Sequence, residues 1–429
     1  MPDIKWVILG LVVLMYAFVI IFPQKKAIWT IAAGVIVVLL GVVTPQKAVF
    51  ELVSWAILMI YVGSLAIAEL FIYSKVPSRL ASEIVNHSPN PGIAIVIILI
   101  ITAIISAFVE NVATVLLMAP IALSLCKKIK VMPTFFMIGL AVMANLEGTA
   151  TLVGDPPSMI FASQANYSFN DFFVYAGKPS IFFIVQIGML AGALFFYFLF
   201  AKSIKNKITV ENDKIISMVP TVLLLLMIVL LAACSFILND GVTMEAGITV
   251  MALAVIGVLW YKFARKESGT ATWHLVKHLD WETIAFLIGI FVVVGGLEAT
   301  GILGEFALYL GGLIGNNVLL GFIIIILVSI VISGFVDNVP YIIAMLPVAK
   351  ALSDNMGLPN AELYEFALLV GSCLGGNLTP FGASANIVAV GILKKNDIKI
   401  GFGGWLKVGL PFTLITTTTA AIALWFIWK

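Results

Sequence analysis

Hydrophobic residues follow one another along this chain in runs long enough to cross a bilayer. An α-helix needs about 20 mostly apolar residues to span the hydrocarbon core, so most runs predict one transmembrane helix each. We therefore expect an all-α polytopic membrane protein with roughly ten crossings and no soluble domain. The runs occupy residues 6–22, 27–43, 52–73, 93–125, 133–165, 179–201, 217–238, 244–262, 282–300, 318–353, 362–393 and 404–428.

Two of these runs, 93–125 and 318–353, are too long for one crossing and carry an acid–amide pair near the middle. The pairs are Glu110-Asn111 and Asp337-Asn338. A charged side chain at mid-membrane is costly unless it faces protein or a water-filled cavity. Each run is therefore predicted to be a re-entrant hairpin that holds its polar pair at the tip.

Two other runs, 133–165 and 362–393, are interrupted by glycine and proline. The interruptions are Gly154-Asp155-Pro156-Pro157 and Thr379-Pro380-Phe381-Gly382. Proline removes a backbone hydrogen-bond donor, and unwound backbone at membrane depth is tolerated only where protein or a cavity surrounds it. These runs predict two broken transmembrane helices.

The hairpins and the broken helices recur in the same order. Residues 106–112 (SAFVENV) match 333–339 (SGFVDNV) at an offset of 227, and 148–154 (GTATLVG) match 376–382 (GNLTPFG) at an offset of 228. Such self-similarity indicates internal duplication. We predict a first repeat over 1–203, a cytoplasmic linker over 204–216 and a second repeat over 217–429. Each repeat has three spans, a hairpin, a broken helix and a final span, so an odd number of crossings inverts the second.

Lysine and arginine provide an independent test of this topology. With the hairpins returning to their own side, 19 of the 24 basic residues fall on one side and 5 on the other. The larger group includes Lys26, Arg79 and Lys128, with the segments 202–214, 262–277 and 394–399. Because cytoplasmic loops carry the excess of lysine and arginine, both termini are predicted to lie outside a cell inner (plasma) membrane.

Composition excludes several classes of protein. Hydrophobic residues make up 62% of the 429 residues and charged residues only 11%, well below the ~25% of soluble domains. The net charge of +2 gives no sign of a nucleic-acid partner. The three cysteines have no paired spacing, no phosphate-binding GxxxxGK[ST] sequence is present, and no serine–histidine–acid set lies in the spans. We expect no enzyme activity and no cofactor.

The acid–amide pairs and the broken helices are the candidate binding site. Carboxylate, amide and carbonyl oxygens suit a hard cation, so Glu110, Asn111, Asp337 and Asn338 are predicted to bind sodium. Exposed helix N-termini suit an anion. Two acids, Glu147 and Asp155, are candidate proton carriers, because a buried carboxyl binds a proton more readily than one in water. The remaining candidate residues are Thr114, Thr149, Thr151, Gly154, Asn377, Thr379, Pro380, Gly382, Ser384 and Asn386.

Four segments together resemble the motifs of the ion transporter superfamily: 110–114 (ENVAT), 148–157 (GTATLVGDPP), 337–340 (DNVP) and 382–386 (GASAN). The most similar branch contains the arsenite permeases, the NhaD-type sodium/proton antiporters and the melanosomal P protein. The divalent anion/sodium symporters and citrate transporters are more distant relatives. The resemblance covers nearly the whole chain and implies an elevator-type carrier, usually a homodimer, with a cytoplasmic ATPase subunit as a further partner if the substrate is an arsenical.

The leading hypothesis is an ion-coupled secondary carrier for a small inorganic or organic anion or a metalloid, with sodium or protons as the coupling ion. Sodium/proton antiport is the alternative. A channel-like permease is less favoured, as is an intramembrane enzyme, since the repeat predicts similar rather than opposed roles for Glu110 and Asp337. The spans contain no arginine, which argues against tight bidentate binding of an oxyanion.

Overall fold

The computed structural model describes residues 2–22, 25–200, 213–238, 241–356 and 362–429. In these residues the predicted all-helical architecture is confirmed, apart from one antiparallel pair of short strands, β1 (Val174–Tyr175) and β2 (Lys178–Pro179). Seven helices are long and apolar enough to cross a membrane, and shorter apolar helices of 10–17 residues stand beside them. Fewer than ten helices reach this length, because the runs 133–165 and 362–393 are divided between helices and the apolar helices Ile4–Val19 and Lys26–Leu39 are short.

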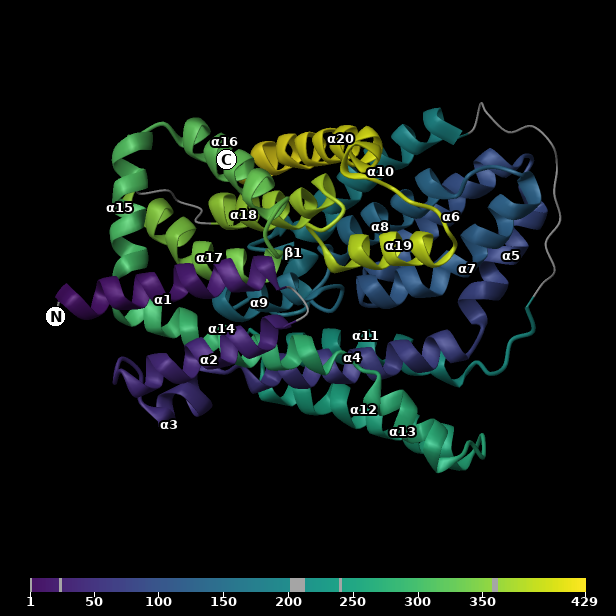
Figure 1. Ribbon diagram of the computed structural model, residues 1–429, viewed down its shortest axis with the longest axis horizontal. Helices are drawn as coiled ribbons and strands as arrows, with labels where there is room; N and C mark the ends of the chain where they lie inside the picture. Colours follow the sequence, from purple (N-terminus) through teal and green to yellow (C-terminus); the bar gives the residue numbers. More distant parts are fainter. Residues whose placement is uncertain (1, 23–24, 201–212, 239–240, 357–361) are drawn as a thin grey trace.

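The first part of the chain contains the paired strands and ten α-helices in the described residues (Figure 1). A π-helical turn and a 3₁₀ turn accompany them. The elements are α1 (Pro2–Ile21), α2 (Lys26–Leu39), α3 (Pro45–Lys47), η2 (Ala48–Leu52), α4 (Trp55–Tyr73), α5 (Val76–His87), α6 (Pro91–Ser106), α7 (Asn111–Ile129), α8 (Thr134–Gly148), α9 (Pro156–Ala165), η3 (Asn170–Phe172), β1, β2 and α10 (Ile181–Phe200).

The second part of the chain repeats the order of the helices, and its described residues contain no strand. A short helix again precedes a pair of apolar helices, and another pair divided by a non-helical break follows them. The elements are α11 (Val219–Leu238), α12 (Met244–Phe263), α13 (Gly269–Lys277), α14 (Trp281–Ala299), α15 (Ile302–Ile314), α16 (Val318–Ser333), α17 (Asn338–Asn355), α18 (Glu362–Gly375), η4 (Gly376–Leu378), α19 (Ser384–Lys395) and α20 (Phe402–Trp428).

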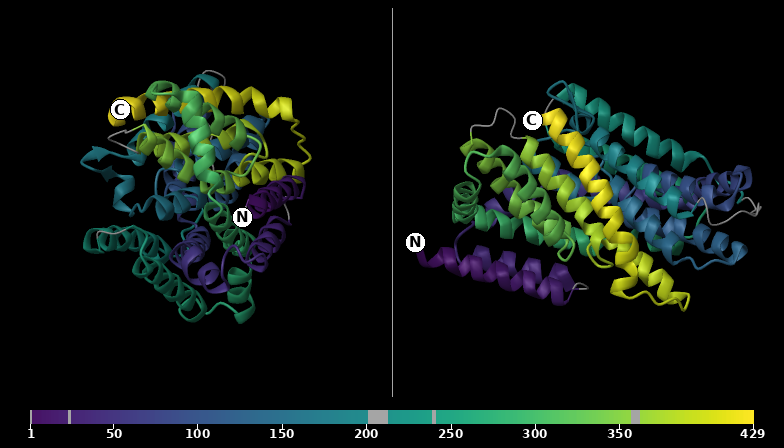
Figure 2. Two further views of the ribbon diagram at one scale, coloured as in Figure 1. Left: turned by 90° about the vertical axis from the view of Figure 1, so that its left-hand side faces the viewer. Right: turned by 90° about the horizontal axis from the view of Figure 1, so that it is seen from above.

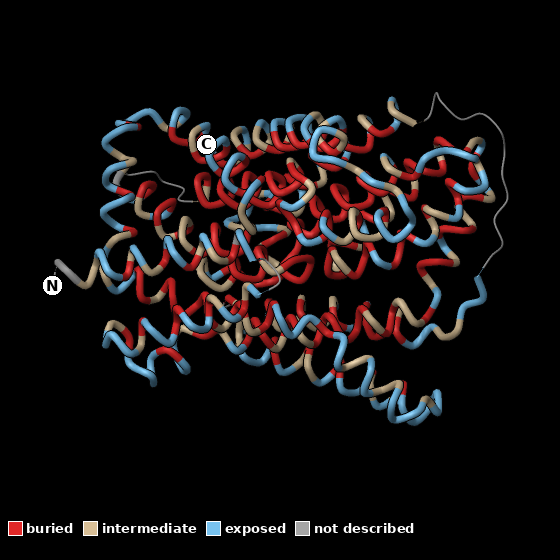
Figure 3. Tube along the Cα trace, in the orientation of Figure 1, coloured by how far each residue is buried: buried red, intermediate tan, exposed pale blue. Residues whose placement is uncertain are grey.

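The helices form two layers, which the end-on view in Figure 2 separates clearly. In one layer, α2 packs on α14 and α4 packs on α12, so each contact joins the two parts of the chain. The other layer contains the pairs α6–α7 and α16–α17 and the divided helices α8/α9 and α18/α19, with α10 packed on α20. Buried residues concentrate inside this second layer, while the outer faces of the helices are exposed (Figure 3).

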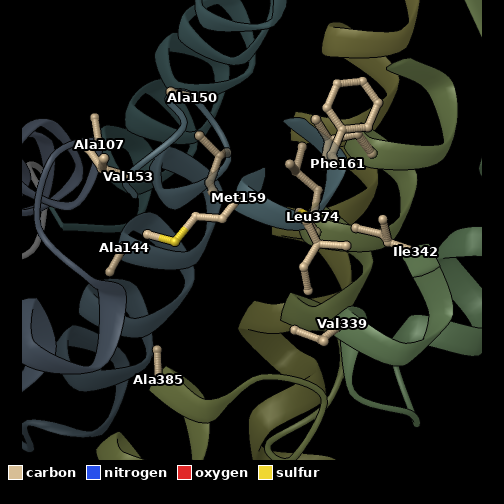
Figure 4. Packing of buried hydrophobic residues seen from close by; sticks show 14 of the residues in the cluster. Ala107, Ala144, Ala150, Val153, Met159, Phe161, Val339, Ile342, Leu374 and Ala385 are labelled. Atoms are coloured by element: carbon tan, nitrogen blue, oxygen red, sulfur yellow. The ribbon is translucent and has the colours of Figure 1, made fainter. Parts of the chain in front are cut away.

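The core of the second layer interleaves the two parts of the chain. Helix α7 packs on α19, α17 packs on α9, and α8 packs on α19. Figure 4 shows the apolar side chains at this junction, with Ala144 and Met159 of the first part near Leu374 and Ala385 of the second. All four are buried to 1% exposure or less. Apolar packing therefore brings segments more than 200 residues apart in sequence to one central place.

Figure 1 places α5 and α13 toward one end of the long axis, and α3, α15 and the N-terminus toward the other. The predicted cytoplasmic segment 202–214 falls mostly outside the described residues. Lys26 was assigned to the cytoplasmic side with no prediction of its exposure, and its side chain is only 16% exposed and lies beside Asp337.

Candidate functional site

Six helices begin at one central cavity: α2, α7, α9, α14, α17 and α19. Its volume is about 40 Å³. Helix N-termini carry partial positive charge, so their convergence favours negatively charged groups in the cavity. The cavity is lined by Lys26, Tyr61, Glu110, Asn111, Asn145, Asp155, Pro156, Pro157, Asp280, Thr283, Asp337, Asn338, Val339, Gly382, Ala383 and Ser384.

The turns that join α6 to α7 and α16 to α17 have the same local structure. Glu110 precedes α7 and its carboxylate accepts a hydrogen bond from the backbone N–H of Ala113 at 2.9 Å. Asp337 precedes α17 and accepts one from Val339 at 3.1 Å. Their backbone angles are also alike, with φ −46° and ψ 137° at Glu110 and φ −53° and ψ 135° at Asp337. Each acid caps its own helix, which holds the carboxylate at the cavity wall.

Threonines in the broken helices attach each break to the neighbouring turn. The Thr151 hydroxyl donates to the carbonyl of Ala107, and the Thr379 hydroxyl donates to the carbonyl of Gly334. Both threonines are fully buried. These two predicted site residues therefore position the turns from behind rather than line the cavity.

The two breaks differ at the start of the helix that follows. Asp155 caps α9 by accepting a hydrogen bond from the Ser158 N–H at 2.9 Å. Ala383 occupies the same place before α19 and provides no side-chain cap. The positive end of α19 is therefore open at the cavity, whereas a carboxylate of the protein covers that of α9.

Charge in the cavity is strongly unequal. Glu110, Asp155, Asp280 and Asp337 contribute four carboxylates against the single ammonium of Lys26. The Lys26 Nζ lies 3.3 Å from Asp337 Oδ2. Sequence reasoning missed Lys26, because it stands beside a second lysine just before an apolar run and was assigned to the cytoplasmic side.

Asp280 is the second charged residue that sequence reasoning missed. It caps α14 through the Thr283 N–H at 3.0 Å, and its other oxygen accepts a hydrogen bond from the Tyr61 hydroxyl at 3.3 Å. The only signal in the sequence was an Asp-x-x-Thr pattern before an apolar run, which predicts the start of a helix and nothing about a site.

A row of buried amides connects the first turn to the second broken helix. Asn111 Nδ2 donates to Asn145 Oδ1 at 2.9 Å, and Asn145 Nδ2 donates to Asn377 Oδ1 at 3.1 Å. Asn377 Nδ2 then donates to the Val142 carbonyl at 3.3 Å. Asn145 was not predicted, since a single asparagine within an apolar helix has no distinctive spacing.

The structure brings seven of the predicted residues to the cavity and places the others behind it. Glu110, Asn111, Asp155, Asp337, Asn338, Gly382 and Ser384 line the cavity. Thr114, Thr149, Thr151, Gly154, Asn377, Thr379, Pro380 and Asn386 do not line it, although most of them are buried. Glu147 also lies away from the cavity, where its carboxylate accepts a hydrogen bond from Gln186 Nε2 at 2.6 Å.

We expect Asn145→Leu to lower the thermal stability of the protein. The change leaves the amides of Asn111 and Asn377 without their partner, and each buried polar group that loses its hydrogen bond costs about 1–3 kcal/mol. A thermal melt of the purified protein measures the effect. Asn396→Leu, at an exposed position at the end of α19, is the control. Equal melting temperatures for the two variants would contradict a structural role for the amide row.

Comparison with known proteins identifies the group to which this chain belongs. A sequence model described as a citrate transporter matches residues 16–371. An uncharacterized transporter of Mycobacterium tuberculosis, Rv2685, is 30% identical over 87% of this chain and 86% of its own length. Another, Mb2703 of Mycobacterium bovis, is 28% identical over 97% of this chain and 98% of its own length.

The human P protein is 23% identical over 76% of this chain, which matches only 47% of that longer protein. The crystal structure of the YdaH transporter of Alcanivorax borkumensis is similar in fold, with a TM-score of 0.59 at 13% identity over 91% of this chain and 87% of that one. The resemblance seen in the motifs is thus confirmed by relatives that are transporters rather than enzymes. The chain belongs to the citrate transporter family of membrane transporters.

Proposed function

We propose that this protein is a cation-coupled secondary carrier and that sodium ions or protons bind to the carboxylates of the central cavity. The observation that carries the proposal is the charge of the cavity, where four carboxylates face one ammonium. Each carboxylate accepts a hydrogen bond from a backbone N–H at the start of its helix, which holds it at the cavity wall. The excess negative charge attracts hard cations, and carboxylate and amide oxygens are suitable ligands for them.

This charge supports sodium/proton exchange over the transport of a free anion. An anion entering the cavity would meet more negative than positive side chains, and no arginine lines the wall to pair with it. The four acids Glu110, Asp155, Asp280 and Asp337 offer several places for a metal cation and for protons. Competition between the two kinds of ion for the same carboxylates is the physical basis of exchange.

Transport of an organic or inorganic anion together with cations is the second candidate. It is supported by the uncapped N-terminus of α19, where Ala383 replaces the acid that closes α9. A carboxylate of the substrate would cap the N-terminus of α19, as Asp155 caps α9 in the first part of the chain. Cations bound to the remaining acids would then offset the charge of the anion. The buried thiol of Cys373 does not line the cavity, which gives no support to a thiol site for arsenic.

We further propose that the layer holding the paired and divided helices moves as a unit against the layer of α2, α4, α12 and α14, in the manner of an elevator. The interleaved contacts α7–α19 and α17–α9 favour movement as one body. The recurrence of the same caps and threonine contacts in both parts of the chain supports an inverted repeat, which supplies two related orientations of the cavity.

Proteoliposomes containing the full-length protein and an internal pH-sensitive dye test these proposals. For exchange, an outward sodium gradient should acidify the vesicle interior by drawing protons in, without any added anion. For the second candidate, the same gradient should leave the pH unchanged, and an opposite gradient should drive uptake of radiolabelled citrate, a dicarboxylate or arsenite. Fluxes that ignore both sodium and proton gradients would contradict the whole proposal.

A further inference from the structure

Lys26 is the only basic residue among the described residues that line the cavity, and it comes from the layer opposite its partner. It begins α2, which packs on α14, and its ammonium also lies 4.9 Å from the centre of the Phe286 ring of that helix. Its partner Asp337 is at the start of α17 in the other layer. The ion pair therefore connects the two layers across the cavity.

A second hydrogen bond crosses at the same place. The Tyr16 hydroxyl of α1 donates to the carbonyl of Pro340, in the first turn of α17, at 2.9 Å. One contact from α1 and one from α2 thus both reach the start of α17. The Tyr16 hydrogen bond goes to a backbone carbonyl and does not depend on bound cations. The Lys26 contact depends on the charge of Asp337.

The Lys26–Asp337 pair is poorly placed to serve stability alone. Its side chains are 16% and 30% exposed, and an ion pair open to water contributes little to folding. Asp337 uses Oδ1 to cap α17 and offers Oδ2 to Lys26. The ammonium therefore occupies the oxygen of this carboxylate that does not cap α17.

We propose that the Lys26 ammonium is a resident countercharge that occupies the cation position at Asp337 and is displaced when a monovalent cation binds there. This inference rests on the proposed cation-coupled function. A cation at Asp337 Oδ2 replaces one positive charge with another, so the charge at this carboxylate is unchanged. The lysine can only donate hydrogen bonds, so it cannot serve as a ligand and is repelled from the occupied site. Its release breaks the ion-dependent contact between α2 and the turn before α17, while the Tyr16 bond to Pro340 stays in place.

The first test uses the unmodified full-length protein and an amine-acylating reagent, with labelling of each lysine quantified by mass spectrometry. Saturating sodium chloride should raise the labelling of Lys26 several-fold relative to choline chloride. The exposed Lys47 should label equally in both salts. Labelling of Lys26 that is unchanged or lower in sodium would overturn the inference.

The second test measures the apparent sodium affinity from the thermal shift of Lys26→Met, Lys26→Arg and the control Lys47→Met. Loss of the competing ammonium should tighten sodium binding in Lys26→Met on the order of tenfold. Lys26→Arg and Lys47→Met should stay near the unmodified protein. If the unmodified protein binds sodium and Lys26→Met has the same apparent sodium affinity, this inference is overturned. The proposed cation-coupled function then stands. If sodium, lithium and potassium all leave the melting temperature of the unmodified protein unchanged, this inference is overturned. Coupling of transport to metal cations is then overturned as well.

Discussion

Asp337→Asn is expected to reduce gradient-driven transport by about a hundredfold or more, while the protein remains folded. Asparagine is as good a helix cap as aspartate, so the start of α17 should keep its structure. The amide has no negative charge for Lys26 or for an arriving cation. Without that charge a cation loses its main electrostatic attraction to the site, and a hundredfold loss corresponds to about 3 kcal/mol of binding free energy.

Flux in proteoliposomes under imposed sodium and proton gradients measures the loss, and a thermal melt shows whether the variant is folded. Asp155→Asn is the matched comparison, since it also replaces a cavity acid that caps a helix. We expect it to be milder, because the second part of the chain has Ala383 at the corresponding place. Transport by Asp337→Asn at the unmodified rate and with unchanged ion dependence would remove this carboxylate from the coupling site.

Gly154→Ala is expected to destabilise the first broken helix and abolish transport. A methyl group at this position would overlap the carbonyl oxygen of Gly148, a backbone atom at the end of α8 that cannot rotate away. The break has to close tightly here, because Thr151 ties it to Ala107 on one side and Asp155 starts α9 on the other. Relief by backbone movement should cost about 3 kcal/mol or more.

A control for this variant is available in the second broken helix. Gly391→Ala lies in α19, where an added methyl group meets no atom within 4 Å. Alanine favours an exposed helix by up to about 1 kcal/mol over glycine, so this control should melt at the same or a higher temperature. Gly382→Ala, which would bring the methyl group 2.6 Å from the Gly376 carbonyl oxygen, should behave like Gly154→Ala. Comparable melting temperatures for Gly154→Ala and Gly391→Ala would show that the close approach is not required.

Sequence alone predicted the site residues that are polar but lie within long apolar runs. Glu110 and Asp337 are conspicuous within long apolar runs, because an ionised group there has no water to solvate it. The prolines near Asp155 and Thr379 similarly exclude continuous helix. These polar residues and prolines indicated where one helix stops and the next one begins. The starts of the following helices form the cavity wall.

The remaining residues could not be predicted, because tertiary packing decides what they contact. Lys26 and Asp280 lie in short polar linkers, where charged residues are usually exposed. Both are brought to the cavity by the packing of α2 on α14, which joins segments that are more than 200 residues apart. The contacts of Thr151 and Thr379 could not be predicted for a related reason. A hydroxyl near an unwound segment can serve a ligand or the backbone, and here both serve the backbone.

The row of amides from Asn111 through Asn145 to Asn377 has a direction. Each amide donates toward the next, so all of them point the same way, and the last ends on the Val142 carbonyl. A half-turn of any one amide would set oxygen against oxygen or NH₂ against NH₂, so neighbouring amides have to turn together. The Val142 carbonyl at the end of the row can only accept a hydrogen bond, so it fixes the orientation of Asn377 and, through it, of Asn145 and Asn111. The row therefore has one favourable arrangement, which sets the orientation of the amide beside Glu110 from the other part of the chain.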